Sequence, residues 1–210
     1  MLYDKDIREP LFDFLEEAYG KLRIIEEKQV GKSRADIVMV LPGLLTGIEI
    51  KSDADSYVRL SRQVKDYDRF FDRNMVVAGS SLAAHVREHV PGWWGIITVE
   101  QNDREIDFYV LRQPQENPMM NWKRKLSLLW RAELAHIQEL TAMPRYKEKS
   151  KAFVIEKILA KVPGEQLSVL VSEELFERDY TRIEEVIRAY KIQNRPELKG
   201  RTGKRKRRRP

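Results

Sequence analysis

Three β-branched runs near the N-terminus constrain the fold of this chain more than any other feature. They are LRIIEEKQV at residues 22–30, ADIVMVL at 35–41 and LLTGIEIK at 44–51. Stretches that contain glycine separate the runs, and the Pro42-Gly43 pair marks a turn between the last two. We therefore expect three consecutive strands, of which the last two form a hairpin.

Helical patterns flank these strands. Apolar residues at helical spacing predict a helix from residue 6 to 18 that ends near Gly20. A second helix is predicted within 52–71, and its core-facing residues are Val58, Leu60, Val64 and Phe71. A strand (NMVVAGS), a short helix (SLAAHVREHV) and two more strands (WWGIITV and EIDFYVL) follow. The order of helices and strands predicts an α/β fold.

The pattern changes to helices alone after Pro114 and Pro118. NWKRKLSLLWRAELAHIQEL at 121–140 reads as one helix, and three further amphipathic segments follow it. We expect an α/β domain at residues 1–116, a small all-helical domain at 117–198 and a disordered basic tail at 199–210.

The positive charge of the chain is concentrated in this tail. Residues 199–209 contain eight Lys or Arg and no acid, so the net charge of +6 becomes −2 for residues 1–198. A tail without apolar residues cannot bury surface, and its natural ligand is a polyanion whose phosphates it neutralises. The predicted nucleic-acid contacts here are Lys204, Arg205, Lys206, Arg207, Arg208 and Arg209. The alternative is an unstructured end without a specific role.

Several classes of protein are disfavoured. The chain has no cysteine, so disulfides, thiolate zinc sites and cysteine nucleophiles are excluded and a bound metal must sit on oxygen or imidazole. Neither a Gly-rich phosphate loop nor a G-x-S-x-G elbow occurs. No apolar run of about 20 residues occurs either, and the acidic N-terminal segment is unlike a secretory signal. We expect a cytoplasmic protein.

One group of residues suggests chemistry. Glu49 and Lys51 are two apart on one strand and therefore point to the same face, and hairpin pairing brings Asp36 beside them. The two carboxylates and the backbone carbonyl of Ile50 form an oxygen-rich site that suits Mg²⁺ or Mn²⁺. An ammonium beside two carboxylates is expected to keep its proton, so we assign Lys51 electrostatic stabilisation rather than general-base catalysis.

The stretch ADIVMVLPGLLTGIEIK resembles the motif of the PD-(D/E)XK nuclease superfamily, with Asp36, Glu49 and Lys51 at the matching positions. The resemblance covers roughly residues 5–80. It implies a restriction-endonuclease-like core, α-β-β-β-α-β with a mixed central sheet, and catalysis by these three residues. Ala35 stands where the family often has proline.

Two further sets of residues extend the resemblance. QVKDY at residues 63–67 is similar to the Q-x-x-x-Y motif of RecB-like nucleases, which implies that Gln63 and Tyr67, with Arg59 one turn earlier, contact DNA phosphates or position the site. An ordinary polar helix face is the alternative. The family's extra carboxylate on the first helix would be Glu9, with Glu16 and Glu17 as competing candidates.

The function expected from the sequence is a magnesium-dependent deoxyribonuclease that hydrolyses phosphodiester bonds. Its role would lie in DNA repair or recombination, or in defence against phages and mobile elements. The partner is DNA, with RNA left open. The rival interpretations are a nuclease-fold protein that binds nucleic acid without cleaving it and a scaffold subunit of a larger complex.

Overall fold

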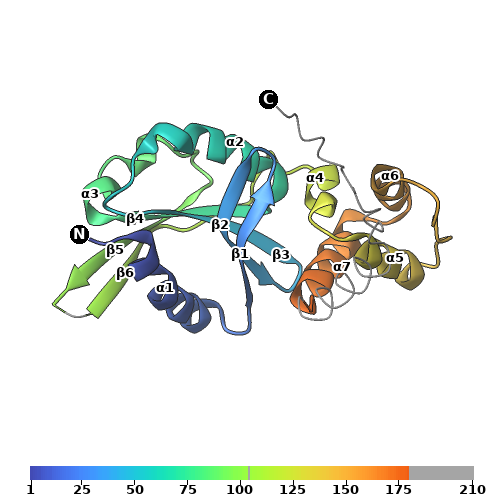
Figure 1. Cartoon of the computed structure of the whole chain (residues 1–210), viewed down its shortest axis with the longest axis horizontal. Coiled ribbons are helices and arrows are strands. Elements are labelled where there is room, and N and C mark those ends of the chain that lie inside the picture. The colour runs from blue at the N-terminus through green and yellow to red at the C-terminus, as the bar shows by residue number, and fades with distance from the viewer. Residues whose placement is uncertain (104, 180–210) are drawn as a thin grey trace, which may run out of the picture. The chain divides into compact units, whose positions relative to one another are not determined.

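Six strands in the described part of the chain form one mixed sheet whose spatial order, β1 to β6, follows the sequence (Figure 1). The computed structural model describes residues 1–103 and 105–179. The strands are β1 (Arg23–Val30), β2 (Ser33–Leu41), β3 (Leu44–Lys51), β4 (Arg73–Gly79), β5 (Gly95–Asn102) and β6 (Glu105–Arg112). β1, β2 and β3 pair antiparallel, β3, β4 and β5 pair parallel, and β6 is antiparallel to β5. The predicted α/β class is confirmed at this level.

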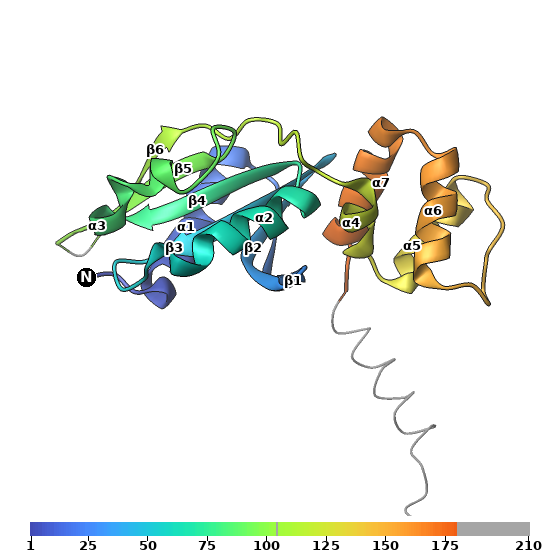
Figure 2. The same ribbon diagram turned by 90° about the horizontal axis from the view of Figure 1, so that it is seen from above.

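Helices pack on both faces of the sheet (Figures 1 and 2). On one face, α1 (Asp4–Tyr19) buries Ile7, Leu11 and Leu15 in a cluster that includes Ile48 and Ile50 of β3. The opposite face is covered by α2 (Leu60–Phe70), which follows the short 3₁₀ helix η1 (Tyr57–Arg59). Successive side chains of a strand point to opposite faces, so Glu49 and Lys51 of β3 point towards α2.

One residue of the predicted second helix lies elsewhere than expected. Leu60, Val64 and Phe71 are buried, whereas Val58 is 85% exposed. The separate 3₁₀ turn at Tyr57–Arg59 explains the error, because Val58 precedes α2 and is out of phase with its buried face. The connection between β4 and β5 holds α3 (Ser80–Ala83) and a second 3₁₀ turn, η2 (Val86–Glu88).

The C-terminal helices are α4 (Trp122–Ser127), α5 (Arg131–Leu140), α6 (Lys151–Lys161) and α7 (Gly164–Phe176). The prediction of one helix over 121–140 is wrong, since α4 and α5 are separate. Trp130 has extended backbone, with ψ at 168°, and its N–H donates to Glu133 Oε2 at 2.5 Å. This cap starts a new helix where hydrophobic periodicity alone suggests continuation.

Contacts tie these helices to the sheet. Lys125 Nζ of α4 donates to both carboxylate oxygens of Asp72 at 2.7 Å, and the Gly43 N–H donates to Ser172 Oγ of α7 at 2.8 Å. Met1–Glu177 form one compact unit. The domain boundaries at residues 116 and 198 stay predictions.

Gly47 of β3 allows α2 to lie close to the sheet. A Cβ at this position would lie 2.3 Å from Phe71 Cδ2 and 2.8 Å from Tyr67 Cδ1, closer than carbon atoms can approach. The rings of Tyr67 and Phe71 pack edge to face with their centroids 5.5 Å apart, so neither ring can move away alone. A residue without a side chain is therefore required beneath these two rings.

We predict that Gly47→Ala lowers the free energy of unfolding by about 1–3 kcal/mol, the usual range for overpacking a dense core. Gly92→Ala is the matched control, because a Cβ there meets nothing within 4 Å. Urea denaturation followed by circular dichroism measures both variants. Equal stability of the two would show that the packing at Gly47 is not as tight as described.

Candidate functional site

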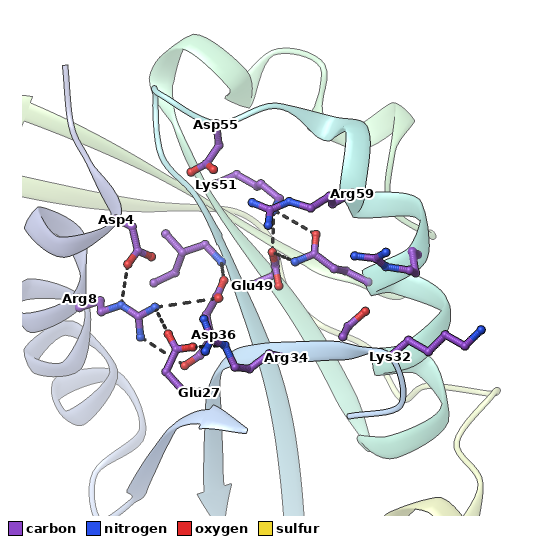
Figure 3. A pocket seen from close by; sticks show the side chains of 14 residues that line it. Asp4, Arg8, Glu27, Lys32, Arg34, Asp36, Glu49, Lys51, Asp55 and Arg59 are labelled. Atoms are coloured by element: carbon purple, nitrogen blue, oxygen red, sulfur yellow. Dashed lines mark hydrogen bonds and ion pairs between the residues drawn. The ribbon is translucent and has the colours of Figure 1, made fainter. Parts of the chain in front are cut away.

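A polar cavity of about 430 Å³ opens between α1, the β1–β2 turn, the ends of β2 and β3 and the start of α2 (Figure 3). Nearly all of the residues that line it are charged or polar: Asp4, Arg8, Glu27, Lys32, Ser33, Arg34, Asp36, Glu49, Ile50, Lys51, Asp55, Arg59, Arg62 and Gln63. The three residues expected at the centre of the site, Asp36, Glu49 and Lys51, all line this one cavity.

The hairpin register explains why Asp36 and Glu49 meet. Ile37 of β2 pairs with Ile48 of β3, so Asp36 stands opposite Glu49 one residue further along. Asp36 Oδ2 accepts a hydrogen bond from the Ile50 N–H at 2.8 Å. The Ile50 side chain packs on the α1 face of the sheet, so Ile50 lines the cavity with its backbone. The N–H and the carbonyl of one strand residue point to the same side of the strand, so the Ile50 carbonyl faces the same side of β3 as the N–H that Asp36 binds.

Glu49 and Lys51 form a buried ion pair. Their side chains are 2% and 3% exposed, and Lys51 Nζ lies 2.6 Å from Glu49 Oε1. Lys51 also donates to Gln63 Oε1 at 3.1 Å. A charged pair removed from water in this way needs hydrogen bonds to satisfy its remaining polar atoms.

Helix α2 supplies these hydrogen bonds. Gln63 Nε2 donates to Glu49 Oε1, and the Tyr67 hydroxyl donates to Glu49 Oε2 at 2.6 Å. The Tyr67 oxygen in turn accepts from the Asp36 N–H at 3.1 Å. The spacing of four residues places Gln63 and Tyr67 on one face of α2, and each donates a hydrogen bond to one carboxylate oxygen of Glu49.

Two of the residues predicted to bind nucleic acid have different environments. Gln63 lines the cavity, whereas Tyr67 is fully buried and does not line it, so the burial of Tyr67 disfavours direct contact with phosphate, and the alternative, that Tyr67 positions the site, stays a prediction. Burial, together with the nearby Glu49 carboxylate, raises the pKa of Tyr67. Arg59 is exposed and lines the cavity, whereas residues 204–209 lie outside the described residues.

Helix α1 brings Asp4 and Arg8 to the cavity, and not Glu9. Glu9, Glu16 and Glu17 are exposed and do not line the cavity, so the acid that this helix brings to the cavity is Asp4 and not the predicted Glu9. The reason is helical phase, since Ile7 and Leu11 face the core and a residue at position 9 is turned away from both. The i, i+4 pair of Asp4 and Arg8 is the sequence signal that could have revealed this.

The β1–β2 segment contributes further charges that the sequence did not reveal. Glu27 has φ of +54°, a left-handed conformation that is strained for a residue with a side chain. Its carboxylate lies 2.7 Å from Arg8 Nη2 and 2.5 Å from Arg34 Nε. This strained conformation places an acid between two arginines at the cavity wall.

Exposed cations lie around the cavity mouth. Lys32, Arg59 and Arg62 are exposed and line the cavity, and none forms an ion pair with another residue in the described part of the chain. They contrast with Arg8 and Lys51, which are paired with carboxylates at distances of 3.0 Å or less. The positive charge that remains available to an anion is therefore on the rim.

The carboxylates could hold a hard cation, although the set of donors is small. No group of three or more His, Asp or Glu arranged for a metal ion occurs within residues 1–103 and 105–179. Asp36, Glu49 and the Ile50 carbonyl provide oxygen donors alone, and Mg²⁺ commonly takes only one or two protein carboxylates and keeps its water. The donor chemistry fits Mg²⁺ or Mn²⁺ on this basis.

The electrostatics of Asp36 reflect its burial and its position beside a second carboxylate. Burial raises the pKa of Asp36 to about 7, and the Glu49 carboxylate contributes to the rise. The Ile50 N–H and the Lys51 ammonium act in the opposite direction and do not offset it. A bound divalent cation would favour the ionised form of Asp36.

The fold and the cavity define an α/β protein whose sheet carries a buried ion pair, Glu49 and Lys51. Helix α2 covers this pair with Gln63 and Tyr67. The sequence model of the family described as "Bacteriophage P4 protein cII" matches residues 1–195, and the chain belongs to this family. Protein cII of Enterobacteria phage P4 is 28% identical over 101 residues, which are 48% of this chain and 38% of the phage protein. The match thus spans well under half of that relative.

A solved structure with a low similarity is that of SfsA from Pyrococcus furiosus in complex with Ca²⁺. The identity is 16% and the TM-score is 0.33, over 53% of this chain and 62% of SfsA. This similarity is too low to define the fold. Among the helices within the described residues, none has the length and apolar character needed to cross a membrane.

We predict that Asp36→Asn stabilises the metal-free protein at pH 8. The pKa of Asp36 rises from 3.8 to about 7 on folding, so the native state binds more protons than the unfolded state between these values, and the free energy of unfolding falls as the pH rises through them. The neutral variant avoids this loss and gains about 2–4 kcal/mol over the wild type at pH 8, but little at pH 4.

Urea denaturation in the presence of EDTA, at pH 4 and pH 8, measures this effect. Asp13→Asn is the control, because Asp13 is an exposed acid of α1 outside the cavity, and its replacement should not give a gain in stability at pH 8 like that of Asp36→Asn. Parallel pH profiles for the wild type and Asp36→Asn would contradict the prediction.

Proposed function

We propose that this protein is a metal-dependent nuclease that hydrolyses DNA phosphodiester bonds, built on a restriction-endonuclease-like core. The observation that carries the proposal is that Asp36, Glu49, Lys51 and the Ile50 backbone line one cavity. The exposed cations at its rim support an anionic substrate, and the all-oxygen donors support Mg²⁺ or Mn²⁺. The cytoplasmic location and a role in repair, recombination or defence stay predictions.

In this proposal, the residues of the chain divide the work by position. Asp36 and Glu49 would hold the metal with the Ile50 carbonyl, and the bound metal would supply Lewis-acid stabilisation and a water of lowered pKa. Lys51, held by Glu49 and Gln63, would direct its positive charge at the phosphoryl oxygen. Gln63 and Tyr67 would keep the Glu49 carboxylate in one orientation.

A second candidate is a protein that binds nucleic acid without cleaving it. Both oxygens of Glu49 already accept hydrogen bonds, and the described residues hold no metal-binding group of three acids or histidines. These observations favour a site in which the Glu–Lys pair has only a structural role. The two candidates share the rim and differ in whether the carboxylates bind a divalent ion.

We predict that the protein cleaves labelled DNA in the presence of Mn²⁺ and that Asp36→Ala and Lys51→Ala each lower the rate by about 100-fold or more, because each removes charge from the reacting centre. Asp13→Ala and Lys65→Ala replace exposed residues outside the cavity and should cleave at the wild-type rate. Calorimetric titration with Mn²⁺ accompanies the assay. Full cleavage by both site variants would end the proposal, while DNA binding without Mn²⁺ binding would favour the second candidate.

We predict that replacing Lys32, Arg59 and Arg62 together by Gln weakens DNA binding and makes it less dependent on salt. Each phosphate that a rim cation no longer neutralises should reduce the slope of log K against log[salt] by about 0.9, so the triple replacement lowers it by about 2–3. Fluorescence anisotropy at several NaCl concentrations measures the slope. A triple Gln variant of the exposed bases Lys65, Arg69 and Arg87, which do not line the cavity, should keep the wild-type slope. Equal slopes for the two triple variants would exclude the rim as the binding surface.

A further inference from the structure

Arg8 is the most heavily paired cation of the cavity. Its guanidinium lies 2.7 Å from Asp4 and 2.7 Å from Glu27 (Figure 3). It also lies 3.0 Å from Glu26. Its Nη1 also donates to the Asp36 backbone oxygen at 3.4 Å, and its Nη2 lies 4.0 Å from Asp36 Oδ1. The side chain is only 15% exposed. Four acidic residues from α1, β1 and β2 therefore surround one cation.

This pairing makes Arg8 a poor ligand for a phosphate. All three guanidinium nitrogens already contact carboxylates, so an incoming anion would have to displace at least one of them. The unpaired cations on the rim have no such competition. The charge of Arg8 is directed at the acids of its own protein.

The same guanidinium stands where it would oppose a divalent ion. Arg8 is the cation nearest to the free oxygen of Asp36, since the other oxygen accepts from the Ile50 N–H. Arg8 Nε also donates to Asp4 Oδ2, and Asp4 is the only acid of α1 that lines the cavity. A divalent ion and Arg8 carry like charges and require the same oxygens.

We propose that Arg8 is a built-in counter-ion that competes with the divalent metal for Asp36 and Asp4. Without metal, Arg8 holds the acidic side chains together. A bound metal would take these oxygens from Arg8, and Asp4, which forms no three-acid group with Asp36 and Glu49 in the present arrangement, would be released to turn towards them. This inference rests on the metal site of the proposed function and assigns to Arg8 the control of metal affinity.

Calorimetric titration of the full chain with Mn²⁺ tests the inference. Arg8→Gln removes the competing charge and should lower the Kd for Mn²⁺ by about tenfold or more, because the repulsion of a like charge is relieved. Arg34→Gln is the matched control: Arg34 lines the same cavity and pairs with Glu27, but has no contact with Asp4 or Asp36 in the described chain. Its Kd should stay within about threefold of the wild type. Addition of Asp4→Asn to Arg8→Gln should remove most of the gain.

Thermal unfolding in EDTA and in Mn²⁺ provides a second readout. It remains informative if Arg8→Gln is unfolded in EDTA, because Mn²⁺ should then restore the folded state. Arg8→Gln removes the cation that four acids share, although Glu27 keeps its pairing with Arg34, so the Tm of the variant should fall in EDTA and rise more than that of the wild type in Mn²⁺. Unchanged or weaker Mn²⁺ binding by Arg8→Gln, or failure of Mn²⁺ to restore an unfolded variant, overturns the role of Arg8 but not the proposed function. Absence of Mn²⁺ binding in the wild type and in Arg8→Gln overturns both.

Discussion

The buried ion pair of Glu49 and Lys51 is the interaction on which the arrangement of the cavity depends. Two charges removed from water cost several kcal/mol each, and their mutual attraction alone does not reliably offset that cost. Here the remaining polar atoms are satisfied by Gln63 and Tyr67, so the pair is stable only while α2 keeps its place on the sheet. The ion pair of β3 therefore depends on the packing of α2 against the sheet.

Helix α2 packs closely against β3 at one residue, Gly47. Gly47 lies beneath the rings of Tyr67 and Phe71, and without a Cβ it lets α2 come near enough for the Tyr67 hydroxyl to reach both Glu49 and the Asp36 N–H. The Tyr67 hydroxyl thus links β2, through the Asp36 N–H, to β3, through the Glu49 carboxylate. The hairpin register sets Asp36 opposite Glu49, and the packing of α2 places the Tyr67 hydroxyl within hydrogen-bonding distance of both strands.

The parts of this arrangement differ in how far the sequence predicts them. Asp36, Glu49 and Lys51 could be placed on one face because strand alternation and hairpin register are short-range rules. The burial of Tyr67 could not, since a polar helix face looks the same in sequence whether it meets water or a buried carboxylate. The role of Arg8 depends on the rotation of α1 relative to β2, which the packing of Ile7, Leu11 and Leu15 determines. For the same reason the sequence does not show that Asp4 and Arg8, and not Glu9, reach the cavity from this helix.

The charges of the cavity are also separated by depth, and this separation limits what it can bind. Deep in the cavity, Arg8 and Lys51 each lie against carboxylates, so the interior has little free positive charge for an anion. At the mouth, Lys32, Arg59 and Arg62 are exposed and hold no acid among the described residues. A simple anion would stay at the mouth, and a simple cation would meet repulsion on its way in. Under the proposed function, a polyanion that brings its own divalent ions would satisfy both regions at once, because its phosphates would meet the rim while the ions would compete with Arg8 for the carboxylates.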